Sequence, residues 1–171
     1  NNCCRVEDKF GKDFSVRQRL IFVLKLWPYM VPLILVFFAE YAMQAGAWAA
    51  IGFPVTEAAA RTKFYTYANW CYQAGVFLAR SSGELVQLPM AALWAMPLLQ
   101  TFFLAFFCAD ALWQFWWGWT LLGPCFVTGL LGGAVYVNAF TLIRHDIPPS
   151  EGCELALTSA SLGDSLGIML S

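Results

Sequence analysis

Glu40 is the residue whose type and surroundings most directly suggest chemistry. It lies in an apolar stretch that holds no other charged residue between Lys25 and Glu57. If that stretch crosses a membrane, an acid at its middle costs roughly 2.5–3.5 kcal/mol on insertion scales, so it must face a polar interior, pair with a base or carry a proton. Gln44 shares its helical face. Two interpretations stay open: a substrate-binding or proton-coupling site, or a structural acid hydrogen-bonded to a neighbouring helix.

Asp164 is a second acid among apolar neighbours, and Thr158 and Ser161 precede it. Acids in two separate apolar segments strengthen the functional interpretation of each, because both need shelter from lipid. Together Glu40 and Asp164 suggest one common interior pathway.

A polar stripe runs between these two acids in the chain. Asn69, Gln73 and Arg80 follow at i, i+4 and i+11, close to three helical turns, with Tyr65 and Tyr72 beside them. A lipid-facing helix would not carry such a stripe, so we expect it to line a cavity, with Gln73 at a depth suited to ligand contact. Arg80 also fits a simpler role as an anchor at the cytoplasmic end of the helix, which we favour.

Small residues at i and i+4 predict close contacts between helices. Gly129 and Gly133 have this spacing, and Gly163 and Gly167 repeat it. Both pairs are assigned to packing. Asn138 has two open interpretations, as a hydrogen bond between helices or as part of a pocket.

The sequence predicts no enzyme, cofactor or metal site. Its six cysteines have no regular spacing, and a single histidine makes a zinc site improbable. No GxSxG, phosphate-binding glycine loop or HExxH occurs. The net charge is −1, and no basic stripe predicts nucleic-acid binding.

The elements that hold these residues are predicted to be membrane helices. The chain is 60% hydrophobic and 12% charged, whereas soluble domains carry about 25% charged residues. No charge occurs in residues 85–109 or in residues 111–143, and each run exceeds the ~20 residues that cross a bilayer. We therefore expect an all-α, polytopic transmembrane helix bundle whose partner is the lipid bilayer.

The predicted organisation has two parts. Residues 1–25 form a polar, amphipathic segment on the headgroup surface, and residues 26–171 form the transmembrane domain. The expected spans are 26–53, 64–79, 85–112, 117–143 and an incomplete 154–171. Because the last span stops early, we expect the chain to be part of a longer protein.

Basic residues predict the orientation of the bundle. Six of the ten Lys and Arg residues fall in the first 25 positions. Placing this segment in the cytosol leaves eight basic residues on that side and two, Arg61 and Lys63, on the other. The positive-inside rule therefore predicts a cytosolic N-terminal segment.

Four blocks of sequence resemble the battenin family of lysosomal and fungal vacuolar membrane proteins. They are residues 36–41 (VFFAEY), 72–82 (YQAGVFLARSS), 129–138 (GLLGGAVYVN) and 164–168 (DSLGI). They occur in the family's order, each on the corresponding helix, and the resemblance covers about residues 15–171.

That resemblance implies part of the C-terminal half of a major-facilitator-like fold, with the seventh to tenth helices and part of the eleventh. The absent N-terminal half of the same protein would be its partner. The resemblance places Glu40 and Tyr41 in the seventh helix, Gln73 and Arg80 in the eighth, Asn138 in the tenth and Asp164 in the eleventh. Thr128 stands where the family often has an acid, so a proton or cation role at that position is not expected.

The resemblance also implies a lysosomal or vacuolar location and two possible functions. One is transport of small polar metabolites, related to glycerophosphodiesters or basic amino acids, with a link to organelle pH. It predicts Glu40, Gln73, Asn138 and Asp164 around one water-filled cavity. The other is a membrane scaffold or trafficking protein that retains a transporter fold, which predicts that these groups pair tightly with no cavity.

Overall fold

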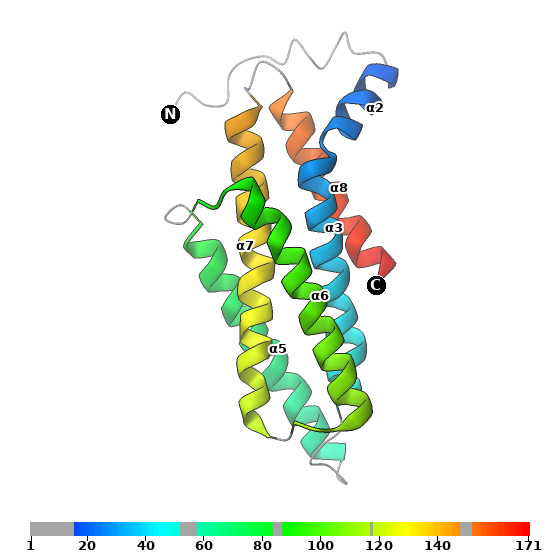
Figure 1. Cartoon of the computed structure of the whole chain (residues 1–171), viewed down its shortest axis with the longest axis vertical. Helices are drawn as coiled ribbons and strands as arrows, with labels where there is room; N and C mark the ends of the chain where they lie inside the picture. Colours follow the sequence, from blue (N-terminus) through cyan, green and yellow to red (C-terminus); the bar gives the residue numbers. More distant parts are fainter. Residues whose placement is uncertain (1–15, 52–57, 84–86, 117, 148–151) are drawn as a thin grey trace.

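The computed structural model describes residues 16–51, 58–83, 87–116, 118–147 and 152–171, and these are almost entirely helical (Figure 1). The elements are α2 (Val16–Lys25), α3 (Trp27–Ala42), the π-helical turn η1 (Met43–Ala47), α4 (Trp48–Ala50), α5 (Ala58–Ser81), α6 (Met90–Trp113), the 3₁₀ turn η2 (Trp119–Leu121), α7 (Leu122–Asp146) and α8 (Cys153–Leu170). No strand occurs among the described residues. Most of the predicted N-terminal segment, residues 1–15, lies outside them.

Three stretches are long and apolar enough to cross a membrane: Trp27–Ala50, Met90–Trp113 and Trp119–Asp146. The predicted all-α, polytopic membrane bundle is therefore confirmed. Helix α5 extends beyond the predicted 64–79 at both ends, to 24 residues. The helix begins with three consecutive alanines, which have high helix propensity. The predicted bounds follow the apolar residues alone and therefore leave this first turn out.

Helix α3 continues through η1 and α4 as one long segment with a change of register. Pro28 lies in its first turn, where a missing backbone N–H is tolerated. The π-helical turn Met43–Ala47 begins three residues after Glu40. Such turns insert an extra residue into a helix and often occur at functional sites.

Helices α5 and α7 lie side by side (Figure 1) and approach closely through glycines. A Cβ atom added at Gly129 would overlap the Tyr72 carbonyl, and one added at Gly75 would overlap the Phe126 carbonyl. At Gly133 a Cβ would lie 2.8 Å from the Val76 carbonyl. The two backbones therefore meet with no room for side chains.

Helix α8 packs on α3 in a similar way, but through one close glycine. A Cβ at Gly167 would lie 2.6 Å from the Ile34 carbonyl, whereas one at Gly163 would make ordinary contacts at 3.6 Å with Met30. Gly167 therefore sets the approach of α8.

Two apolar cores fill the bundle, one toward each end. The first includes Trp48, Tyr72, Phe107 and Cys125. The second includes Leu33, Phe37, Leu93, Val135 and Ile143. Along α3, α6 and α7, a short polar interval separates the two cores.

Candidate functional site

A buried polar layer, made of Glu40, Tyr72, Gln100 and Thr128, occupies the interval between the two cores. The Glu40 side chain is 1% exposed. The Tyr72 hydroxyl donates to Glu40 Oε2 at 2.9 Å, and Gln100 Nε2 donates to Glu40 Oε1 at 3.5 Å and to the Thr128 carbonyl at 3.4 Å. Residues of four helices therefore meet at one carboxyl group.

Gly132 makes the space that the carboxyl group fills. A Cβ atom at this position would overlap Glu40 Oε1. With Phe37 on one side along α3 and Met43 on the other, both buried, the group is shielded from water in both directions. Among the described residues no Lys or Arg forms an ion pair with Glu40, so its oxygens rely on hydroxyl and amide donors.

This arrangement gives the carboxyl group few partners for a negative charge. An ionised carboxylate in a water-free layer is costly without full hydrogen bonding or a paired cation. Two donors reach it here, and the Gln100 bond is at the long limit of hydrogen-bond geometry. The Oε1 atom of Gln100 is buried without a hydrogen-bond partner among the described residues. This amide oxygen beside Glu40 can therefore accept one more hydrogen bond.

Gln100 and the Tyr72 hydroxyl were not among the predicted site residues. The signal for Gln100 was present, because it is an amide within the charge-free run 85–109. Unlike Asn69 and Gln73, it has no second polar residue at helical spacing that would mark a polar face. Tyr72 was noted only as a neighbour of the polar stripe, since sequence does not show where its hydroxyl points.

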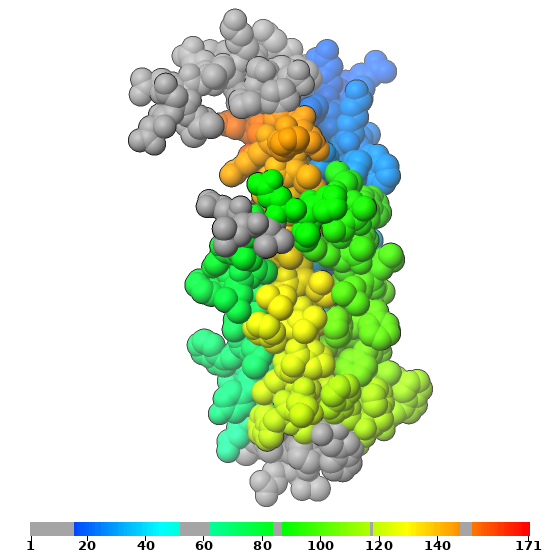
Figure 2. Space-filling view, turned by 60° about the vertical axis from the view of Figure 1, so that its left-hand side comes forward, coloured from blue at the N-terminus to red at the C-terminus, as the bar shows by residue number. Residues whose placement is uncertain are grey.

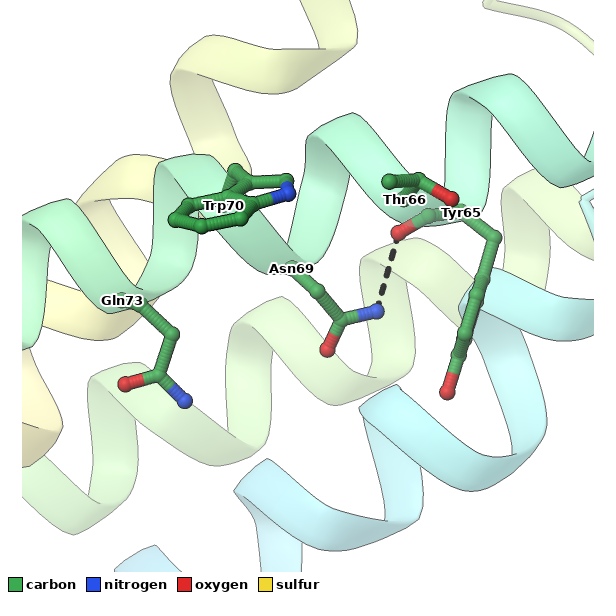
Figure 3. Close-up of a pocket in the computed structure, with 5 residues that line it drawn as sticks. All are labelled: Tyr65, Thr66, Asn69, Trp70 and Gln73. Atoms are coloured by element: carbon green, nitrogen blue, oxygen red, sulfur yellow. Dashed lines mark hydrogen bonds between the residues drawn. The ribbon is translucent and has the colours of Figure 1, made fainter.

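The predicted polar stripe on α5 lies at the surface of the described bundle. A groove of about 320 Å³ is lined by Tyr65, Thr66, Asn69, Trp70 and Gln73. Figure 3 shows Tyr65, Asn69 and Gln73 pointing to the same side of the helix. Asn69 Nδ2 donates back to the Tyr65 carbonyl at 2.9 Å, whereas the exposed Gln73 extends from the helix.

Gln44 and Tyr41 lie between the surface and the buried layer. Gln44 is half-buried and lies one helical turn beyond Glu40. Tyr41 is 37% exposed.

Asn138 is held by protein on both sides of its amide. Its Nδ2 donates to the Ala134 carbonyl at 2.8 Å, and its Oδ1 accepts from the Leu88 N–H at 2.7 Å. The side chain is buried. Of the two interpretations left open by the sequence, this geometry supports the link between helices.

Asp164 lies on α8, half-buried, and accepts from the Ser165 N–H at 2.7 Å. It is not part of the buried layer. Among the described residues, neither Glu40 nor Asp164 forms an ion pair with Arg80.

The four residues expected around one cavity therefore have different surroundings. Glu40 lies in the buried layer, Gln73 in the α5 groove, Asn138 at the α5–α6 connection and Asp164 on α8. A second groove, of about 360 Å³, lies along α7 and α8, and neither groove is lined by Glu40 or Asp164. No three His, Cys, Asp or Glu residues of the described chain gather as metal ligands do.

These features define a class of protein, a multi-pass α-helical membrane protein with a desolvated carboxyl group at its centre. Residues 5–171 match the family model described as CLN3 protein. The chain belongs to this family, which confirms the resemblance to battenins.

Curated relatives show the same family likeness. The chain is 36% identical to Battenin of Canis lupus familiaris over 163 residues, covering 94% of the chain and 36% of the relative. It is 37% identical to Protein BTN1 of Yarrowia lipolytica over 152 residues, covering 84% of the chain and 36% of the relative. The match to Protein BTN1 of Saccharomyces cerevisiae is 32% over 179 residues, covering 92% and 42%. The chain thus spans well under half the length of these relatives. No solved structure matches it.

Proposed function

We propose that this chain is part of a secondary transporter that moves small polar metabolites across a lysosomal or vacuolar membrane and contributes to organelle pH. The observation that carries the proposal is a water-shielded carboxyl group at the meeting point of four helices, 1% exposed and without an ion-pair partner among the described residues. Membership of the CLN3 family supports the location. Compounds related to glycerophosphodiesters or basic amino acids are the substrate classes that the battenin resemblance suggests.

In the proposed mechanism, the remaining length of a battenin-sized protein supplies the opposite half of a major-facilitator-like fold. Rocking of two halves about a midplane site then exposes the polar face of α5 to each side in turn. Glu40 exchanges a proton with the lumen or the cytosol by way of the Tyr72 hydroxyl, which donates to it at 2.9 Å. Protonation removes the cost of a buried charge and so favours a different arrangement of the surrounding helices.

The test is Glu40→Gln in the full-length protein, with substrate efflux from vesicles measured against luminal pH. Glutamine keeps the size of the side chain but has no carboxyl proton to exchange, so we expect the pH dependence of efflux to be lost. Glu154→Gln is the matched control, because Glu154 is an exposed acid at the start of α8. A Glu40→Gln protein with unchanged pH dependence would remove Glu40 from coupling.

The scaffold or trafficking function is the second candidate, and a specific observation favours it. Glu40 and Asn138 both have partners within the protein, as a group with a purely structural role would. Untargeted metabolite profiling of purified vacuoles or lysosomes, with and without the full-length protein, separates the two. A transporter changes the content of specific polar metabolites, whereas a scaffold leaves these unchanged when trafficking markers are matched.

A further inference from the structure

Arg80 lies in the last turn of α5, but well inside the end of the bundle that α7 forms. Its guanidinium stacks 4.3 Å from the centre of the Tyr136 ring. Within the apolar segment Trp119–Asp146, Tyr136 stands about 15 Å from one end and about 26 Å from the other at 1.5 Å per residue. An anchor at the cytoplasmic end of a span would lie much nearer the last turn of α7.

The connection after α5 explains this depth. A Cβ at Gly83 would overlap the Val137 side chain, and the Leu88 N–H donates to Asn138 at 2.7 Å. Gly83 and Leu88 therefore meet α7 at Val137 and Asn138, about 12 Å before α7 ends at Asp146. Figures 1 and 2 show α7 and the start of α8 continuing past this connection.

The charge of Arg80 is not neutralised by an adjacent acid. Among the described residues, no carboxylate lies within 4 Å of it, and Glu40 and Asp164 act on it only over a longer range. The Arg80 side chain is exposed on the described bundle. A cation at this depth is costly unless it faces water or an anion, and such residues usually mark substrate or ion pathways.

A groove adjoins the same ring. Tyr136, Val137, Phe140, Thr141, Arg144 and Leu157 line a space of about 360 Å³ along α7 and α8. Arg144, two turns of α7 beyond Tyr136, lines the groove. Arg80 stacks on the ring of Tyr136, which is part of the groove wall. Apolar and aromatic side chains make up most of the lining, and Thr141 contributes a hydroxyl group.

We propose that Arg80, with Tyr136 and the adjoining groove, binds the oxyanion of a small organic molecule, a phosphate ester or a carboxylate. The planar fork of a guanidinium matches both anions with two parallel hydrogen bonds. The stacked Tyr136 ring holds the guanidinium in place, and the apolar lining accommodates the uncharged part of the molecule. When no anion is bound, the long-range attraction of Glu40 and Asp164 partly compensates the Arg80 charge.

This inference rests on the proposed transport function, because a soluble metabolite reaches Arg80 only if the open face of the bundle lines a path. The same chemistry also fits the phosphate of an anionic lipid headgroup. Both sources present an oxyanion to Arg80, and the experiment includes a separate arm for each.

The test measures the thermal midpoint of the purified full-length protein by tryptophan fluorescence. Glycerol 3-phosphate is the soluble probe, glycerol is its uncharged control, and nanodiscs with or without phosphatidylglycerol form the lipid arm. We expect glycerol 3-phosphate to raise the midpoint and glycerol to have no effect. In Arg80→Gln the affinity should fall at least about tenfold, as expected for one lost charge-assisted contact.

Lys63→Gln is the matched control, since it removes one exposed positive charge from the opposite end of the same helix. It should keep the full shift. Arg80→Lys keeps the charge but loses the fork, so it should bind more weakly than the native protein. If Arg80→Gln does not fold, Arg80→Lys decides, and unchanged affinity in that variant overturns the proposal.

The outcomes separate the two sources and the two proposals. An Arg80-dependent shift with glycerol 3-phosphate supports a soluble metabolite, and one seen only with phosphatidylglycerol supports a lipid headgroup. The absence of any Arg80-dependent shift overturns the oxyanion site. If no Arg80-dependent shift is seen but efflux still depends on Glu40, the oxyanion site is refuted and the transport function stands. If the Arg80-dependent shift is seen but no metabolite is transported, the proposed function is refuted and the oxyanion site stands.

Discussion

The residues that surround Glu40 are far from it in the sequence. Tyr72, Gln100 and Gly132 come from three other helices, and the first meets Oε2 of the carboxyl group while the other two meet Oε1. The cost of a buried acid indicated that it needed partners. Their identity depends on how four helices are rotated about their axes.

Gly132 provides a direct test of this packing. Gly132→Ala places a methyl group where the Glu40 carboxylate lies, so we expect a loss of stability of about 1–3 kcal/mol, as for other overpacked sites. Gly123→Ala in the same helix is the control, because nothing lies within 4 Å of its added Cβ. Unfolding in mild detergent measures both.

The control variant should be neutral or slightly more stable, since alanine has the higher helix propensity. A Gly132→Ala protein as stable as Gly123→Ala would show that the carboxyl group of Glu40 does not lie against α7.

The connection between α5 and α6 depends on one amide side chain. The Leu88 N–H donates to Asn138 Oδ1 at 2.7 Å, and the Asn138 Nδ2 donor is satisfied by the Ala134 carbonyl within α7. The end of α5 is thereby held at the level of Tyr136 and Val137.

We expect Asn138→Ala to destabilise the protein by about 1–2 kcal/mol, because it leaves a partly buried N–H without an acceptor. Asn138→Asp is the matched variant, since it keeps an oxygen at the position that accepts from Leu88. Thermal unfolding should rank Asp above Ala. Normal stability of Asn138→Ala together with lost substrate binding would instead identify Asn138 as a pocket residue.

The two ends of the bundle differ in charge in the way that the positive-inside rule describes. Arg17 and Lys25 on α2 and Arg144 at the end of α7 lie toward one end, whereas α5 begins at the other, near Lys63 (Figure 1). At the first end the Tyr29 hydroxyl donates to Asp146 Oδ2 at 2.5 Å and joins the start of α3 to the end of α7.

Cysteine labelling tests the orientation that these charges predict. With the native cysteines replaced by alanine, Arg17→Cys should react with a membrane-impermeant maleimide applied to intact vacuoles from the cytosolic side. Lys63→Cys should react only after permeabilisation. Leu33→Cys, at a position with 0% exposure, should stay unlabelled. Labelling of Lys63→Cys in intact vacuoles would contradict the predicted orientation.

Properties that depend on a single stretch of chain can be predicted from the sequence. Apolar runs predicted the membrane helices, because each helix must satisfy its own backbone and present apolar side chains to lipid. Glu40 was identified by its cost in an apolar segment, and the polar stripe of α5 by its helical spacing. The four sequence blocks predicted the family, which the comparisons confirm.

Properties that depend on how helices pack against one another cannot be predicted from the sequence alone. The π-helical turn Met43–Ala47 alters the register that placed Gln44 beneath Glu40. Arg80 lies in the last turn of α5, as expected, but α5 ends beside Tyr136, about 15 Å before α7 ends. Contacts of this kind are set by rotation and axial position of neighbouring helices, which no periodicity within a single helix encodes. Helix type and membrane class thus follow from local hydrophobicity, while the partners of each polar side chain follow from packing.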